Sequence, residues 1–150
     1  EEWIGMMTLP RVINVIDNKV HFTVPDYIEN LFNKEISVSD FNLDTPCRIK
    51  AKLTSEGKIN IGGYKIYVAD DRIVADRSEV FADCDFKAVE FKSSKLDRRY
   101  DLDIFIDKGI IEIFINDGQY VITNVVYDMK SSVEYDNVCE LKMFEMEHTK

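Results

Sequence analysis

The sequence predicts an all-β protein, an antiparallel two-sheet β-sandwich of the jelly-roll or lectin-like type. Runs of β-branched and aromatic residues that alternate with polar residues recur along the chain, and Gly, Asn and Asp turn signals separate them. Few stretches have the apolar spacing of a helix. Many strands with one apolar face each bury those faces most simply between two packed sheets.

Length and charge restrict the function classes. The chain has 150 residues, 45% hydrophobic and 31% charged, as in one ordinary globular domain. Its formal net charge is −9, and a field of that sign repels phosphate backbones and anionic lipids. Nucleic acid and membrane surfaces are therefore not expected as partners, and no apolar stretch approaches the roughly 20 residues of a membrane helix.

The chain is expected to begin with a β-hairpin and a connector. Val12–Ile16 and Lys19–Val24 flank Asp17-Asn18, two residues that tolerate the positive φ angles of a tight turn. Pro25 then begins one short helical turn. An apolar stripe on that turn is expected from Tyr27, Ile28 and Leu31.

Further strands are expected at short spacing after the connector. They are predicted at Glu35–Phe41, Cys47–Thr54, Lys58–Ile61, Tyr64–Ala69, Arg72–Asp76, Ala88–Phe91, Tyr100–Asp107, Ile110–Ile115, Tyr120–Val126 and Val138–Glu145. Gly62-Gly63 and Asp70-Asp71 supply turn chemistry between strands. Neither pair is therefore interpreted as a phosphate-binding or catalytic site.

The clearest local signal is a hairpin over Ile110–Val125. If Asp117-Gly118 form a two-residue turn, apolar residues lie opposite apolar residues and polar opposite polar. The pairs in this register are Ile115 with Tyr120, Ile113 with Ile122, and Glu112 with Thr123. A three-residue loop would instead place Glu112 opposite Ile122.

Acidic residues are the first candidates for catalysis. Asp101 and Asp103 lie two apart on one face of a predicted strand. The other face carries Tyr100, Leu102, Ile104 and Ile106, and the acidic face adds Phe105 and Asp107. A retaining glycosidase needs two carboxyl groups about 5 to 5.5 Å apart, which such neighbours can reach. A solvated strand face is the simpler interpretation, and a lectin-like glycosidase that uses Asp101 and Asp103 is kept as a rival hypothesis.

No residue is assigned as catalytic, cofactor-binding or metal-binding, and no cofactor is expected. His21 lies in a predicted strand and His148 in the C-terminal tail, so they form neither a zinc triad nor a Ser-His-Asp arrangement. One basic cluster lacks interleaved aromatic residues and is interpreted as a solvated loop. It consists of Lys92, Lys95, Arg98 and Arg99.

The cysteines bear on the compartment. Cys47, Cys84 and Cys139 cannot all pair within one chain, and none lies in a C-x-x-C arrangement. Small buried thiols in a reducing compartment are therefore expected. This favours a cytoplasmic protein over a secreted one.

Three segments carry a family resemblance. Trp3–Arg11 reads W-I-G-M-M-T-L-P-R, Ala75–Ser78 reads A-D-R-S, and Ile104–Gly118 reads I-F-I-D-K-G-I-I-E-I-F-I-N-D-G. The first resembles the end of the catalytic propeller of glycoside hydrolase family 32, the β-fructofuranosidases, invertases and sucrose-6-phosphate hydrolases. The other two resemble the C-terminal β-sandwich of that family. Gly109 stands where the family usually carries Ser, a mild change at a turn.

The resemblance implies retaining hydrolysis of a fructosyl bond by carboxylates that this sequence lacks. The family's Asn-Asp-Pro, Arg-Asp-Pro and Glu-Cys motifs do not occur, and Cys139-Glu140 has the reverse order. The resemblance divides the chain into residues 1–24 as the last propeller strands, 25–33 as a linker and 34–150 as the sandwich domain. A fragment of a longer protein is expected, because neither an initiator Met nor a secretion signal precedes Trp3.

The expected function is a non-catalytic sandwich that stabilises the catalytic propeller, its partner domain, and contributes to a homodimer. The alternative is a stand-alone carbohydrate-binding module in which exposed aromatic residues contact sugars. Apolar residues of the first segment lack their propeller neighbours. Glu1–Val24 is therefore expected either to add strands to the sandwich or to mediate self-association.

Overall fold

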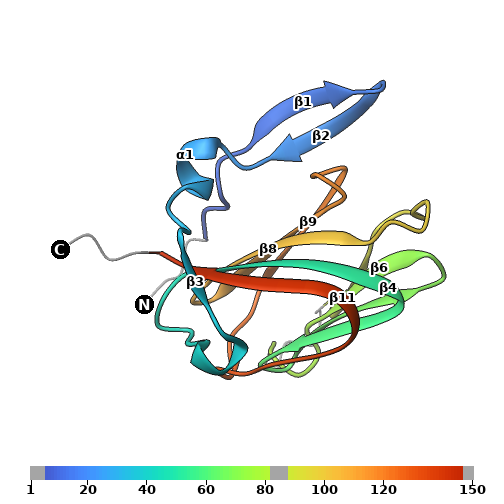
Figure 1. Ribbon diagram of the computed structural model, residues 1–150. Coiled ribbons are helices and arrows are strands. Elements are labelled where there is room, and N and C mark those ends of the chain that lie inside the picture. The colour runs from blue at the N-terminus through green and yellow to red at the C-terminus, as the bar shows by residue number, and fades with distance from the viewer. Residues whose placement is uncertain (1–5, 82–87, 147–150) are drawn as a thin grey trace.

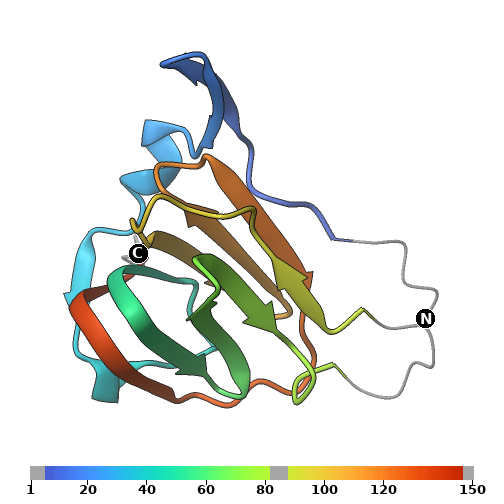
Figure 2. The same cartoon turned by 90° about the vertical axis from the view of Figure 1, so that its right-hand side faces the viewer.

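The computed structural model describes residues 6–81 and 88–146 and confirms the all-β prediction. An antiparallel sheet of nine strands folds over on itself into two layers, and a separate hairpin formed by the first two strands of the chain stands apart from it (Figures 1 and 2). The strand order is β10-β9-β8-β4-β5-β6-β7, with β11 beside β4 and β3 beside β11. These strands are β3 (Lys34–Ile36), β4 (Cys47–Ile61), β5 (Tyr64–Ala69), β6 (Arg72–Asp76), β7 (Glu90–Lys92), β8 (Asp101–Asp107), β9 (Ile110–Ile115), β10 (Tyr120–Val125) and β11 (Val133–Glu145).

Two long strands, β4 and β11, join the layers. The first half of β4 pairs with β8, its last four residues pair with β5, and β11 follows it along both halves. The β4–β11 register shifts near Asp136 and Val138, and such irregularities bend and twist a strand. At Gly57 an added Cβ would lie 2.6 Å from the Cβ of Leu53, so a glycine permits this bend.

The predicted break in β4 is wrong. Cys47–Thr54 and Lys58–Ile61 were expected as separate strands, but Cys47–Ile61 is continuous. The reason is that β11 supplies a hydrogen-bonding partner on both sides of the expected gap. For the same reason β11 begins at Val133 rather than at Val138.

The apolar faces of both layers meet in one large core. Its centre is formed by isoleucines with no exposed surface, among them Ile49, Ile66, Ile73, Ile104, Ile111 and Ile113. The register predicted for β9 and β10 is confirmed, with Glu112 opposite Thr123. Asp117 and Gly118 have φ angles of 58° and 80°, as the two-residue turn requires.

Two local predictions need correction. Of the expected strand Glu35–Phe41, only Glu35 and Ile36 belong to a strand, β3 (Lys34–Ile36). Val38–Asp40 instead forms a 3₁₀ turn (η1), and the Ser37 hydroxyl donates to Asp40 Oδ2 at 2.7 Å. The connector helix α1 is present at Asp26–Glu29. Its apolar stripe is not buried as a unit: Ile28 packs inward, but Tyr27 and Leu31 are exposed.

Candidate functional site

The N-terminal hairpin is a separate two-stranded sheet. It consists of β1 (Val12–Ile16) and β2 (Lys19–Thr23), joined at Asp17 and Asn18, whose φ angles of 49° and 61° confirm the predicted turn. Among residues 6–24, no strand joins the sandwich sheet. The expectation that this segment adds strands to the sandwich is therefore wrong. Residues 6–24 contact the outer surface of β9 and β10 instead.

Apolar side chains of this segment face solvent. The exposed fraction is 93% for Met7, 71% for Val15 and 67% for Ile13. Among residues 6–31, the other exposed large apolar side chains are Met6, Val12, Ile16, Val20, Tyr27 and Leu31. Val15 lies opposite Val20 in the hairpin register, so Ile13, Val15 and Val20 share one face. We call these three residues the hairpin face.

A buried carboxylate attaches the start of the segment to the sandwich. Glu112 lies in β9 and is 2% exposed. The backbone N–H of Leu9 donates to its Oε1 at 2.6 Å, and Arg11 Nη2 donates to its Oε2 at 2.6 Å. The hydroxyl of Thr123 also donates to Oε2, at 3.0 Å. Two of its three donors thus come from residues about a hundred positions earlier in the sequence.

A second attachment lies at the turn between β9 and β10. The Phe22 N–H donates to the carbonyl oxygen of Gly118 at 2.9 Å, and His21 Nδ1 lies 3.1 Å from the carbonyl oxygen of Asp117. A Cβ at residue 118 would collide with the backbone of Phe22. The glycine of this turn therefore permits both the positive φ and the close approach of β2.

Below the hairpin, a small second core covers the outer face of β8 and β9. It contains Val24, Phe32, Phe105 and Phe114. The ring of Phe105 packs edge-on against Phe32 and Phe114, with centroids 5.3 and 5.7 Å apart. This face of β8 was predicted to be solvated, and for Phe105 that is wrong because the connector covers it.

The candidate acids Asp101 and Asp103 are both paired with arginines. Arg48 Nε and Nη2 donate to the two carboxylate oxygens of Asp103 at 2.8 and 2.6 Å, and Arg48 also pairs with Glu29 of α1 at 3.0 Å. Arg99 Nε donates to Asp101 at 2.7 Å. Burial disfavours the Arg48 cation, but the two carboxylates outweigh it and raise the pKa of Arg48 above its ordinary value. These contacts favour a structural role for both acids.

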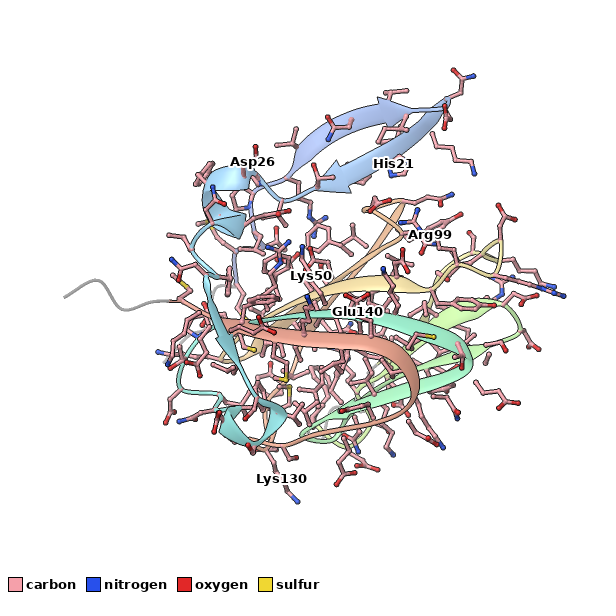
Figure 3. All side chains as sticks on the ribbon, viewed as in Figure 1. His21, Asp26, Lys50, Arg99, Lys130 and Glu140 are labelled. Atoms are coloured by element: carbon pink, nitrogen blue, oxygen red, sulfur yellow. The ribbon has the colours of Figure 1, made fainter. Side chains whose placement is uncertain are left out.

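A groove of about 400 Å³ separates the hairpin from the sheet. Its lining includes Phe22, Glu29, Lys50, Asp101 and Glu140. Figure 3 shows the side chains of Lys50 and Arg99 on the sheet side of this gap, below His21. Charges of both signs line the groove, so it does not favour an anionic or a cationic ligand.

The remaining candidates are accounted for individually. Positive φ angles at Gly62, Gly63, Asp70 and Asp71 confirm the two turns. In the basic cluster, Lys92 pairs with Glu90, and Arg99 pairs with Asp101 and Asp117. Trp3, Cys84 and His148 lie outside the described residues. Within the described ranges, no group of three or more His, Cys, Asp or Glu is placed to hold a metal ion, and no helix is long and apolar enough to span a membrane.

The interpretation of the cysteines as buried thiols is correct for Cys47 and wrong for Cys139. Cys47 is 1% exposed in the main core, but Cys139 is exposed near the register shifts of β11. Burial, with a smaller contribution from the Glu145 carboxylate, raises the pKa of the Cys47 thiol from 9.0 to about 12.

This difference predicts selective alkylation. In the native chain carrying Cys84→Ser, iodoacetamide at pH 8 is expected to modify Cys139 and to spare Cys47, which mass spectrometry measures. Rapid modification of Cys47 without denaturant would contradict the burial.

The raised pKa of the Cys47 thiol also makes stability depend on pH. The thiol ionises near 9 in the unfolded chain and near 12 in the folded chain. Its contribution to the free energy of unfolding is therefore present below pH 9 and is lost as the pH rises from 9 to 12.

Sequence reasoning missed the roles of Glu112, Arg48 and Arg77. The guanidinium of Arg77, in the A-D-R-S segment, donates to the carbonyls of Ala88 and Val125 at 2.9 and 3.0 Å and holds the loop after β6 against β10. The available signal for Glu112 was an acid inside the apolar run Ile110–Ile115. Its partners could not be deduced from local spacing.

Comparison with known proteins identifies the family. The model of the family "Glycosyl hydrolases family 32 C terminal" matches residues 49–145. This chain belongs to that family. The sucrose-6-phosphate hydrolase of Vibrio alginolyticus is 28% identical over 134 residues, which cover 82% of this chain and 27% of that protein.

Solved structures agree on the fold of this glycosyl hydrolase family 32 module. The sucrose-6-phosphate hydrolase of Lactobacillus gasseri superposes with a TM-score of 0.66 at 22% identity, over 91% of this chain and 33% of that one. The exo-inulinase of Aspergillus awamori gives 0.63 at 12% identity, over 91% and 34%. The family 32 module described here thus spans about a third or less of the length of these relatives.

Proposed function

We propose that this chain is the non-catalytic C-terminal sandwich of a fructosyl hydrolase and stabilises the catalytic propeller by packing against it through residues 6–31. The observation that carries the proposal is the exposed hairpin face of Ile13, Val15 and Val20. Each large apolar side chain left in water forgoes about 1.5–3 kcal/mol of burial. A contiguous group of this kind on a small hairpin is typical of an interface.

The activity of the longer enzyme is part of the proposal. The sucrose-6-phosphate hydrolases among the relatives support hydrolysis of sucrose 6-phosphate, with sucrose and longer fructans as the other substrates considered. The carboxylates for this retaining reaction would lie before residue 1. A cytoplasmic location is proposed with it, since the buried thiol of Cys47 suits a reducing compartment. A homodimer of the longer enzyme is proposed as well.

The gene provides the direct test. The reading frame before the codon for Glu1 is expected to encode the Asn-Asp-Pro, Arg-Asp-Pro and Glu-Cys motifs, and the product of the longer frame is expected to hydrolyse sucrose 6-phosphate. A start codon at this position without those motifs would contradict the proposal. Hydrolysis of sucrose but not of sucrose 6-phosphate would change the proposed substrate and leave the proposed reaction unchanged.

The hairpin face makes a prediction for the chain on its own. Without a partner domain, exposed apolar side chains favour self-association, so Ile13→Lys with Val15→Lys is expected to shift the chain toward monomer in sedimentation velocity. The control is Lys19→Gln, at an exposed position of the same hairpin. An unchanged distribution for the double variant would show that the hairpin face does not mediate association.

A second candidate function is carbohydrate binding by the sandwich itself. A groove of about 390 Å³ on β4, β5 and β11 is lined by Tyr67 and Tyr135 together with carboxylate, amide and ammonium groups, which suits sugar rings and hydroxyls. Titration with sucrose, inulin and levan fragments is the test. Saturable binding that Tyr135→Ala abolishes and Tyr127→Ala preserves would support this candidate, and no binding would reject it.

A further inference from the structure

We propose that Glu112 and Gly118 form a two-point mount that fixes the direction in which residues 6–24 leave the sandwich, and that this direction sets the position of the catalytic domain. The inference rests on the proposed function. It assigns a role to the E and the final G of the segment Ile104–Gly118, which carried the family resemblance.

The first point is the Glu112 carboxylate. It lies on the outer face of the sheet, on the opposite side from the main core, and yet is almost fully buried. Arg11 is the cation that pairs with it, and the guanidinium also donates to Thr123 at 3.0 Å and lies 5.8 Å from the centre of the Phe114 ring. Arg11 makes a charge-assisted hydrogen bond through its side chain, which can rotate without moving the backbone. The Leu9 N–H belongs to the backbone itself, so its bond to Glu112 fixes the position of the chain.

The second point is the turn of the same hairpin. Gly118 accepts the N–H of Phe22, and the absence of a side chain there allows β2 to approach. Glu112 holds the chain before β1, and Gly118 holds it in β2. One contact alone would allow the segment to rotate about it, but two contacts on one rigid strand pair define a direction. The hairpin projects away from the sandwich (Figure 1), and the two contacts hold it in that direction.

The charge on Glu112 is matched by the segment rather than by the sandwich. Of its donors, Thr123 belongs to the sandwich and is neutral, while Arg11 and the Leu9 N–H belong to residues 6–24. Burying a charged group is costly unless opposite charges and hydrogen-bond donors pair with it. The carboxylate thus selects the docked path of the segment over other paths on the sheet.

Distance measurement between two spin labels tests the mount on this chain. One label is attached at Lys19→Cys, beside the hairpin turn, and the other at native Cys139, which is exposed; Cys84→Ser removes a third site, and buried Cys47 resists labelling. Pulsed electron paramagnetic resonance is expected to give one narrow distance for the unmodified mount. Glu112→Gln and Gly118→Ala are each expected to replace it with a broad distribution.

Controls separate the mount from general destabilisation. Glu140→Gln changes an exposed carboxylate on the same face of the sheet and should leave the narrow distance intact. Arg11→Gln removes the cation from the segment and leaves the residues of the sandwich unchanged. Broadening is expected there together with a lower thermal midpoint, because the buried Glu112 carboxylate loses its counter-ion, so the distance is measured well below that midpoint, where the sandwich is folded. A narrow distance in both Arg11→Gln and Glu112→Gln would overturn the inference. The proposed function is tested separately, by the reading frame before the codon for Glu1, so the two can fail independently.

Discussion

Asp103→Ala is expected to lower the free energy of unfolding by about 3 kcal/mol, because it removes one partner from a nearly buried ion pair. The Arg48 side chain is 6% exposed and that of Asp103 is 27% exposed. Without Asp103, the guanidinium keeps only Glu29 of α1 and its contact with the Phe105 ring at 5.0 Å. Its desolvation is then no longer balanced.

Urea denaturation measures this loss, with Asp107→Ala as the control. Asp107 lies on the same strand but is exposed, so a change within about 0.5 kcal/mol is expected there. A further variant, Asp103→Asn, tests the rival glycosidase hypothesis. If the wild-type chain hydrolyses a fructoside and Asp103→Asn abolishes that activity while stability is kept, Asp103 is catalytic and the structural role is wrong.

Gly62→Ala is expected to cost about 3 kcal/mol, because the new Cβ would strain the backbone and collide with a second segment. The φ angle of Gly62 is +57°, and a Cβ would lie 2.5 Å from the nitrogen of Lys130 and closer still to its oxygen. The segment cannot withdraw without losing two backbone hydrogen bonds. These join Gly62 N–H to Ser132 O at 2.8 Å and Lys130 N–H to Gly62 O at 3.0 Å.

Gly109→Ala is the matched control for this glycine. Its Cβ would meet the terminal methyl of Met6 at 2.7 Å, and a flexible side-chain end can move aside. A change of less than about 1 kcal/mol in the thermal or urea transition is expected. This agrees with the interpretation of Gly109 as a mild departure from the family pattern. Equal losses for the two alanine variants would show that contact with backbone is not the deciding factor.

Local patterns predicted those elements whose register is determined within a few residues. The hairpin of β9 and β10 was predicted correctly because period-two alternation and the sequence Asn116-Asp117-Gly118 specify the same pairing. The tight turns at Gly62-Gly63 and Asp70-Asp71 follow from residues that tolerate positive φ. In each case the residues whose interaction decides the structure lie close together in the sequence.

The errors arose where a distant partner decides the structure. The polar stretch around Gly57 has the composition of a loop, but β11 pairs with β4 on both sides of it and the strand stays continuous. Phe105 looked solvated because the covering residues, Val24 and Phe32, are more than seventy positions away. The candidate site has the same character: Glu112 can be noticed as an acid in an apolar run, but its bonds to Leu9 and Arg11 span about a hundred residues.

The salt link between Arg11 and Glu112 crosses the expected border between propeller strands and sandwich at residue 24, and this has an evolutionary consequence. A recombination event at that border would join a sandwich that carries a buried anion to a foreign segment without its counter-ion. Such a chimera would be selected against until both residues arrived together. The two parts are therefore expected to be inherited as one unit, and a graft of this sandwich onto another enzyme should begin before Leu9.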